Sequence, residues 1–362
     1  MWMIISVLLA CILIPLGILL YWSYPGKPKS FVDKNGRLLP GSISEKIYVN
    51  INGVKHGIIL QSKDQTKPVL LYLHGGMPEY FLTRRYPTGL EDIFTVCWWE
   101  QRGAGISYDA HTPRETMTVE QMISDTLEVT NYLRQRFGKE KIYLMAHSGG
   151  TFLGIQAAAR APELYYAYIG VSQMVYQLQS EKLAYDYMLQ QFKAKDNTKM
   201  VRKLEAAPVT MTDGTPDAYS ALRDEAMHSL GIGTTHDMKS VIKEIFLASL
   251  QSREYTLMEK IRTWRAKANA GVAMLWREML HTDLSKTAAE FAVPIYFFHG
   301  VYDYTCSYPL AKSYFQKIKA PLKGFYTFER SAHSTIFEEP ERAQKILRED
   351  VLIGGKKLAD PS

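Results

Sequence analysis

Short apolar runs recur along the chain, each bounded by polar or turn residues. They cover residues 69–73, 93–99, 142–145, 168–171 and 295–298. Runs that are apolar at consecutive positions are typical of strands buried on both faces of a parallel sheet. A helical pattern separates several of them, most clearly at 119–137, where Thr118 and Gln121 are placed to cap the start and Gly138 the end. Alternating strands and helices predict a doubly wound, mostly parallel α/β sheet.

The first strands follow a different pattern. Residues 47–51 and 54–61 flank Asn52-Gly53, and this dipeptide between alternating segments predicts an antiparallel hairpin. The strand signal then disappears between Val171 and Pro294, where the pattern is mostly helical. We expect this stretch to be a helical cap inserted into the sheet domain. Beyond it, a strand at 324–328 and a closing helix at about 336–350 are predicted.

The N-terminal segment differs from the rest in having no charged side chain before Lys27. As a helix, residues 1–22 would extend about 33 Å, which is enough to cross a bilayer. Trp22 and Tyr24 at its end fit an interfacial aromatic belt. We therefore predict an uncleaved transmembrane anchor. A cleaved secretory signal is an alternative, but such signals usually have a basic n-region, which this segment lacks. Leu8-Leu9-Ala10-Cys11 resembles a lipoprotein cleavage box, which is a further alternative.

Charges around this segment bear on its orientation. Lys27, Lys29, Lys34 and Arg37 follow the apolar run, and no Lys or Arg precedes it. The positive-inside rule therefore favours a cell-membrane protein whose large domain is cytoplasmic.

These patterns divide the chain into successive parts. The predicted parts are a transmembrane anchor (1–24), a linker and lead-in (25–43), an α/β core (44–173 and 292–352), a helical cap (174–291) and a C-terminal tail (353–362).

Composition narrows the function classes. The net charge is +6, but the basic residues are scattered through segments of mixed sign, which argues against nucleic-acid binding. Cys11, Cys97 and Cys306 form neither a CxxC pair nor a zinc-binding spacing. We therefore expect no metal and no cofactor, and the pattern gives no indication of the oligomeric state.

The segment 144–151, Leu-Met-Ala-His-Ser-Gly-Gly-Thr, follows a predicted strand and opens a predicted helix. Ser148 occupies the serine position of a nucleophile elbow in which Ala146 replaces the first glycine. A nucleophilic serine needs a base and an orienting acid. Asp303 follows a later predicted strand, and His333 lies between the next strand and the last helix. The order Ser, Asp, His is that of α/β-hydrolases.

The remaining site candidates are backbone donors and other histidines. The N–H of Gly149, directly after the serine, and that of Gly76, in the His74-Gly75-Gly76 loop, are predicted to bind the oxyanion. His74, His147 and His299 also lie near the predicted site. We expect His74 and His299 to order the loop backbone rather than to transfer protons. We expect the sharp turn of the elbow to point His147 away from the Ser148 hydroxyl.

Together these segments resemble the proline iminopeptidase-like branch of the α/β-hydrolases. His74-Gly75-Gly76 resembles the start of that family's HGGPG loop, and residues 99–107, Trp-Glu-Gln-Arg-Gly-Ala-Gly-Ile-Ser, resemble its DQRGxGxS segment. Ser148, Asp303 and His333 match its triad. The sequence departs from the family at 77–79, at Glu100 and in the Ala-His-Ser-Gly-Gly elbow, which lacks the usual tryptophan after the serine.

The resemblance implies a serine hydrolase acting through an acyl-enzyme on small peptides or amides with a free N-terminus. In that family, cap carboxylates bind the substrate amine, and the cap here offers Asp224, Glu225, Glu254, Glu259 and Glu278. One alternative is a carboxylesterase or acyl-lipid hydrolase, which the altered loop at Met77 and the anchor favour. Another is a non-catalytic binding protein of the same fold, although such proteins commonly lose a triad member.

Overall fold

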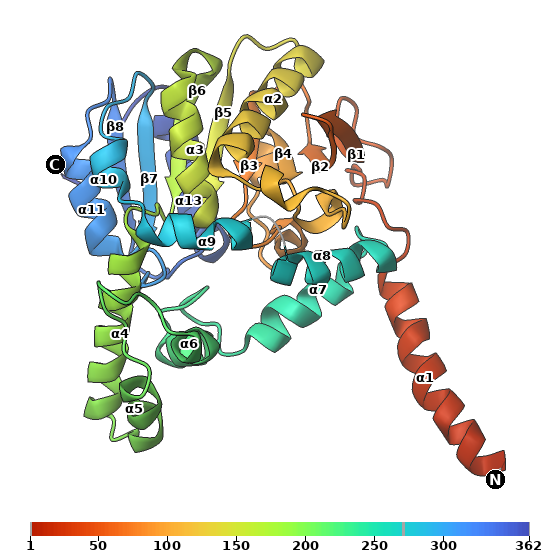
Figure 1. Cartoon of the computed structure of the whole chain (residues 1–362). Coiled ribbons are helices and arrows are strands. Elements are labelled where there is room, and N and C mark those ends of the chain that lie inside the picture. Colours follow the sequence, from red (N-terminus) through yellow and green to blue (C-terminus); the bar gives the residue numbers. More distant parts are fainter. Residues whose placement is uncertain (1, 270–271, 362) are drawn as a thin grey trace.

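The computed structural model describes residues 2–269 and 272–361, and a single mixed sheet forms its centre (Figure 1). The strand order is β1-β2-β4-β3-β5-β6-β7-β8. Strand β2 pairs antiparallel with both β1 and β4, and every later pairing in this sheet is parallel. The strands are β1 (Ile43–Ile51), β2 (Val54–Ser62), β3 (Val69–Leu73), β4 (Thr95–Glu100), β5 (Ile142–His147), β6 (Tyr165–Val171), β7 (Ile295–Gly300) and β8 (Lys323–Phe328). The predicted α/β sheet with an antiparallel opening is confirmed.

The central strands are buried on both faces, as their continuous apolar runs predicted. In β3, Leu71 and Leu73 belong to one hydrophobic cluster, whereas Leu70 and Tyr72 belong to the cluster on the opposite face. Successive side chains of a strand point to opposite faces, so each face needs its own cover. Helices α2 (Val119–Phe137) and α3 (Gly149–Arg160) cover the near face in Figure 1, while α13 (Pro340–Ile346) lies behind the sheet.

Local signals define the predicted ends of two elements. The hairpin turn has positive φ at Asn52 and Gly53, the left-handed conformation that these two residues tolerate best. The Thr118 side chain accepts a hydrogen bond from the Gln121 N–H at 3.1 Å and so caps α2. Gly138 ends that helix with φ of 59°.

The described elements between β6 and β7 are helical. They are α4 (Gln177–Ala194), α5 (Thr198–Glu205), α6 (Asp217–Leu230), a π-helical turn (Ile242–Phe246), α7 (Leu247–Gln251), α8 (Leu257–Asn269), α9 (Val272–His281) and α10 (Leu284–Thr287). Part of this region has a hydrophobic cluster of its own, formed mainly by α4, α5 and α6. In Figure 1 these helices lie below one end of the sheet.

The last part of the chain differs from the expected single closing helix. After β8 it contains α12 (Thr335–Glu338), α13 and a final π-helical turn (Leu347–Val351), whereas α11 (Tyr308–Lys317) lies between β7 and β8. The break falls between α12 and α13 at Pro340, which lacks the N–H needed to continue a helix. The prediction of one helix over 336–350 was wrong at this point.

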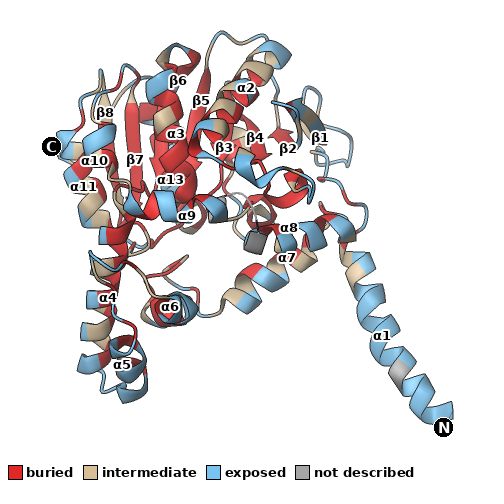
Figure 2. Cartoon of the chain, viewed as in Figure 1, coloured by how far each residue is buried: buried red, intermediate tan, exposed pale blue. Residues whose placement is uncertain are grey.

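The first helix, α1 (Trp2–Trp22), extends away from the rest of the chain (Figure 1), and its side chains are almost all exposed (Figure 2). It is long and apolar enough to cross a membrane, with a mean hydropathy of 2.9. Its C-terminal end is held by the cap, because Lys260 Nζ donates to Trp22 O at 2.9 Å and Gly26 N donates to Arg253 O at 3.0 Å. The segment expected to be a linker therefore packs against the cap.

Candidate active site

Ser148 lies in the sharp turn between β5 and α3. Its backbone has φ of 54° and ψ of −127°, a conformation that is strained for any residue with a side chain. Such strain is typical of a serine held out at the end of a strand. The serine immediately precedes α3, whose first N–H groups have no partner within the helix. Gly149 supplies the first of these N–H groups.

Glycines allow the neighbouring loop to approach this turn closely. A Cβ on Gly75 would lie 2.7 Å from Ser148 Cβ, and one on Gly150 would lie 2.5 Å from His74 O. Both distances are too short for a side chain, so these positions need glycine. Gly76 has open space where a side chain would be and lines a small crevice with His74 and Met77. The loop predicted to supply the second oxyanion donor therefore lies against the serine.

Asp303 and His333 are paired in the loops after β7 and β8. His333 Nδ1 lies 3.0 Å from Asp303 Oδ2 and 3.1 Å from Oδ1. The backbone N–H groups of Thr305 and Cys306 each donate to Asp303 Oδ1 at 2.9 Å. His299 Nε2 lies 3.3 Å from Asp303 Oδ2. The carboxylate is thus fixed from three sides.

Burial and pairing set the charges of the two groups. Burial alone would raise the pKa of Asp303, but the neighbouring His333 and His299 hold it well below its usual value. Burial lowers the pKa of His333 below 6.5, and the attraction of Asp303 offsets this only in part. At neutral pH, the pair therefore combines a carboxylate with a neutral imidazole, the combination that a general base requires.

Ser148 is linked to this pair through its neighbours. The adjacent His147 hydrogen-bonds the backbone of His333 through Nε2. Within the described structure, hydrogen bonds join His333 to Asp303 but none joins Ser148 to His333. Serine–base hydrogen bonds are often long without substrate and shorten when it binds.

A buried ion pair between Glu79 and His147 connects three site loops. His147 Nδ1 lies 2.7 Å from Glu79 Oε1, and His147 Nε2 donates to His333 O at 2.8 Å. Burial opposes both charges, yet each partner stabilises the other. The pKa of His147 is therefore raised and that of Glu79 lowered. The Tyr72 hydroxyl donates to Glu79 Oε2, and the Ser172 hydroxyl donates to His333 O. These two hydrogen bonds complete the network.

Sequence reasoning expected His147 only to point away from the Ser148 hydroxyl, and it missed Glu79. The available signal was that both residues fall in segments that depart from the family pattern, residues 77–79 and the elbow. Two departures at neighbouring motifs are most simply explained by a contact between them.

We expect Glu79→Gln and His147→Gln each to lower the free energy of unfolding by about 3 kcal/mol, because each leaves a buried charge unpaired. The double variant should lose less than the sum, with a coupling of about 1–3 kcal/mol. Protonated His147 stabilises the fold fully below pH 6.5, and this stabilisation is lost as the pH rises through the raised pKa of the folded state. Ionised Glu79 stabilises the fold fully above pH 4.5, and this stabilisation is lost as the pH falls through the lowered pKa of the folded state. Urea unfolding should therefore give the largest coupling between these two values.

The matched control is the exposed pair of Glu120 and Arg160, which joins α2 to α3. A double-mutant cycle there should give a much smaller coupling than the buried pair gives, because solvent screens exposed pairs. Equal couplings in the two cycles would argue against a special role for the buried pair.

Glu338 holds the loop that carries His333. Its carboxylate accepts hydrogen bonds from the backbone N–H of Ala332 at 3.1 Å and of Ser334 at 3.0 Å. It also accepts one at 2.7 Å from the N–H of His236, in the cap. Burial raises the pKa of Glu338 to about 7. The position of His333 is thus tied to the cap.

The cap carboxylates nominated from the sequence are engaged elsewhere or exposed. Glu259 pairs with Lys46 at 2.6 Å, Glu254 accepts from Ser252, and Glu278 is exposed. Asp224 and Glu225 lie at the surface of α6.

Glu181, in α4, is instead fully buried. It binds Arg223 Nε at 2.7 Å and Gln177 Nε2 at 2.8 Å, and Gln177 contacts the loop after Asp303. The sequence signal for Glu181 was its place on the apolar stripe of that helix, between Leu178 and Tyr185.

Other residues of the family motifs support the loops. Arg102 forms a buried double hydrogen bond with Asp125 of α2, at 2.6 and 2.9 Å. His74 accepts from the backbone N–H of Gln101 and contacts Gly75 O, so its ring orders two loops. Among the described residues, no cluster of His, Cys, Asp and Glu side chains is suited to hold a metal ion.

Comparisons with known proteins agree with this architecture. The chain is 29% identical to the probable aminopeptidase YbaC of Bacillus subtilis (strain 168), over 81% of this chain and 91% of that protein. Two solved structures share the fold. The proline iminopeptidase of Mycobacterium smegmatis has a TM-score of 0.61 at 15% identity and covers 85% of this chain and 98% of its own. A membrane phospholipase A, described as a bacterial virulence factor, has a TM-score of 0.59 at 14% identity, covering 98% and 96%.

The family comparison decides the assignment. Residues 65–340, which include Ser148, Asp303 and His333, match the family described as serine aminopeptidase, S33. This match extends over most of the chain. The protein therefore belongs to the S33 serine aminopeptidase family and is a serine hydrolase of the α/β-hydrolase fold.

Proposed function

We propose that this protein is a membrane-anchored, aminopeptidase-like serine hydrolase that cleaves small peptides or amides with a free N-terminus. The observation that carries the reaction type is the hydrogen-bonded pair of His333 and Asp303 beside the strained Ser148. The family match and the relative named as an aminopeptidase support the choice of substrate.

The proposed reaction proceeds through an acyl-enzyme. His333 Nε2 removes the proton from Ser148 Oγ as the oxygen attacks the substrate carbonyl. The N–H groups of Gly149 and Gly76 bind the oxyanion, and His333 then gives its proton to the leaving amine. Water hydrolyses the resulting ester by the same proton transfers in reverse order. Asp303 keeps the proton of His333 on Nδ1 throughout. No cofactor takes part.

The proposed anchor is α1. Its length, its apolar composition and the basic residues after it support a single-pass helix with the hydrolase domain on the cytoplasmic side. Carbonate extraction of membranes tests the anchor, since a spanning helix stays in the pellet. Release into the supernatant, or a mature chain that begins after Trp22, would contradict it.

The substrate proposal is tested with paired aminoacyl anilides and aminoacyl esters, each with a free or an acetylated amine. An aminopeptidase-type site should hydrolyse the free-amine anilide at least tenfold faster than its acetylated partner, because a buried carboxylate left without its ammonium partner costs at least about 1.4 kcal/mol. Full activity on acetylated substrates would exclude this specificity.

A carboxylesterase or acyl-lipid hydrolase is the second candidate. Two observations favour it: the paired or exposed state of the nominated cap carboxylates, and the likeness to a membrane phospholipase A over 98% of this chain, α1 included. Hydrolysis of acetylated esters with no hydrolysis of anilides would support this candidate.

The pH dependence follows from His333, which must be neutral to act as a base. Because burial lowers its pKa below 6.5, we expect kcat/KM to stay high at pH 6.5 and to fall only at lower pH. The acid limb of the kcat/KM profile measures this pKa in the free enzyme. A midpoint above 6.5 would show that His333 is not the titrating base.

A further inference from the structure

The end of α1 and the cap form one unit, although they are far apart in the chain. Lys260 Nζ, on α8, donates to Trp22 O at 2.9 Å, to Ser23 Oγ at 3.1 Å and to Leu250 O at 2.7 Å. An ammonium at the carbonyl end of a helix satisfies acceptors that have no partner in the helix and complements the helix dipole. Lys260 is nevertheless buried, so its charge depends on these acceptors.

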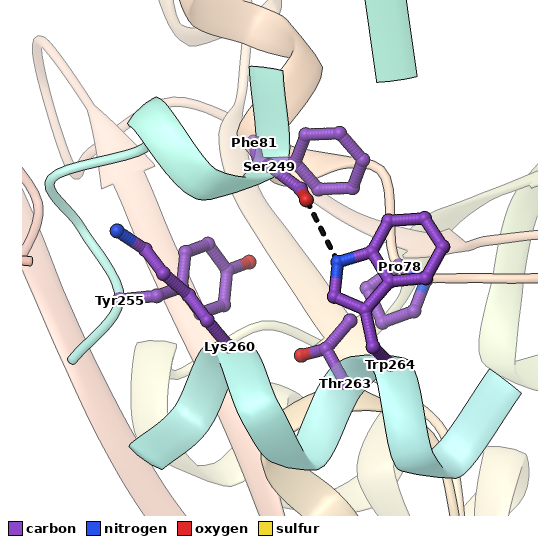
Figure 3. Close-up of a pocket in the computed structure, with 7 residues that line it drawn as sticks. All are labelled: Pro78, Phe81, Ser249, Tyr255, Lys260, Thr263 and Trp264. Carbon is purple, nitrogen blue, oxygen red and sulfur yellow. Dashed lines mark hydrogen bonds between the residues drawn. The ribbon is translucent and has the colours of Figure 1, made fainter. Parts of the chain in front are cut away.

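Apolar packing surrounds this lysine. Figure 3 shows Trp264 facing Phe81 and Ser249, with Tyr255 beside the stem of Lys260, and Trp264 Nε1 donates to Ser249 Oγ at 2.9 Å. Phe81 lies in the turn Tyr80–Arg84, which directly follows the oxyanion loop. The contact therefore brings together α1, the cap and the segment after that loop.

A cleft of about 470 Å³ opens at this junction. Its walls come from the end of α1, from the turn after the oxyanion loop and from α7 with the residues that follow it. The lining residues are Tyr21, Trp22, Phe81, Arg84, Arg85, Ala248, Gln251 and Arg253. Three of these are arginines and none is acidic, and the volume falls in the range of small-ligand sites.

Local contacts hold the three guanidinium groups without neutralising the cleft. Arg84 Nη1 donates to Gln251 O at 2.9 Å. Arg253 Nε donates to Tyr24 O at 2.8 Å, and its guanidinium lies over the Tyr21 ring at 4.8 Å. Arg85 Nη2 lies 3.3 Å from Glu244 Oε2, which is the one acidic partner among these contacts. Each guanidinium has five N–H donors, so donors remain for a ligand with several acceptor oxygens.

The location of the cleft indicates which ligand carries those oxygens. Tyr21 and Trp22 end the apolar helix, and aromatic residues at this point mark the level of the lipid headgroups. Exposed apolar side chains of α1, such as Leu20 and Ile18, continue from the cleft toward the N-terminus. A lipid with its headgroup in the cleft would therefore lay its acyl chains along α1. Basic clusters next to a membrane helix attract anionic lipids.

We propose that this cleft binds the phosphate-bearing headgroup of an anionic phospholipid, with Arg84, Arg85 and Arg253 as its ligands. Arginine binds phosphate through paired N–H donors, which gives direction as well as charge. The site rests on the membrane anchoring proposed above but not on the identity of the hydrolysed substrate. The lipid is a bound partner at the membrane surface, separate from Ser148.

The test uses the full chain purified in an uncharged detergent. It is titrated with dihexanoyl phosphatidylglycerol, dihexanoyl phosphatidylcholine or inorganic phosphate, and binding is followed by tryptophan fluorescence and by native mass spectrometry. We expect phosphatidylglycerol to bind at least tenfold more tightly than phosphatidylcholine or phosphate. The variant Arg84→Gln/Arg85→Gln should lose this preference. Arg84→Lys/Arg85→Lys should keep part of it, because charge remains without the paired donors.

A matched control replaces exposed arginines elsewhere, Arg114→Gln/Arg348→Gln, and should bind like the parent chain. Equal binding of both lipids, or equal losses in the two double variants, would overturn the proposal. Phosphate binding as tight as that of phosphatidylglycerol would identify a free-anion site instead and would also overturn it. Carbonate extraction of the same chain separates this outcome from a failure of the anchor, since an extractable chain contradicts the anchor alone.

Discussion

Replacing Ser148 with alanine is expected to lower kcat by about 10⁴-fold or more, because the acyl-enzyme cannot form without the hydroxyl. Substrate binding should change little, since the oxyanion donors are backbone groups of Gly149 and Gly76. The fold should also persist, because alanine retains the Cβ that packs against Gly75. Initial rates on the preferred ester, together with an unfolding curve, measure both effects.

A serine-directed fluorophosphonate provides an independent measurement. It should add its mass to the peptide that contains Ser148 in the parent chain and leave the Ser148→Ala chain unmodified. Ser220→Ala, at an exposed serine of the cap, is the matched control and should react and turn over normally. Unchanged turnover in Ser148→Ala would rule out this serine as the nucleophile.

The sequence predicted the parts of the fold that depend on local order. Consecutive apolar residues predicted strands covered on both faces, and β3 divides its side chains between two clusters as expected. Asn52-Gly53 and Gly138 sit at positive φ because those positions require it. The single closing helix predicted over 336–350 is interrupted at Pro340, because proline lacks the N–H that would continue the helix.

Contacts between distant segments could not be predicted from the sequence. The pairing of Glu79 with His147 depends on the ends of two neighbouring strands, β3 and β5, lying side by side. The contact of Lys260 with Trp22 joins residues 238 positions apart. Neither contact leaves a periodic signal, because each joins single residues from distant segments. Glu181 is intermediate: its place on an apolar stripe indicated burial, but its partner Arg223 could be found only from the fold.

Replacing Asp303 with asparagine is expected to lower kcat by about 10⁴-fold while leaving KM nearly unchanged, because the amide would favour the wrong tautomer of His333. The carboxylate now accepts from His333 Nδ1 at 3.0 Å. An amide N–H directed at Nδ1 would instead move the ring proton to Nε2, so that this nitrogen could no longer take the serine proton.

The same substitution should also cost stability, and a control must separate the two effects. The pKa of Asp303 is held well below its usual value of 3.8, so its ionised form stabilises the fold above pH 3.8 and this contribution is lost as the pH falls through the folded pKa.

Asp350 is a matched case, a buried aspartate that accepts two backbone N–H groups at 2.8 Å and holds the C-terminal tail. Asp350→Asn should lower the free energy of unfolding but leave kcat within about threefold, since its contacts do not include the site. If both variants lost activity in proportion to their stability, the assignment of Asp303 as the orienting acid would fail. A collapse of kcat confined to Asp303→Asn, with the unfolding transition still cooperative, would instead trace the loss to the tautomer of His333.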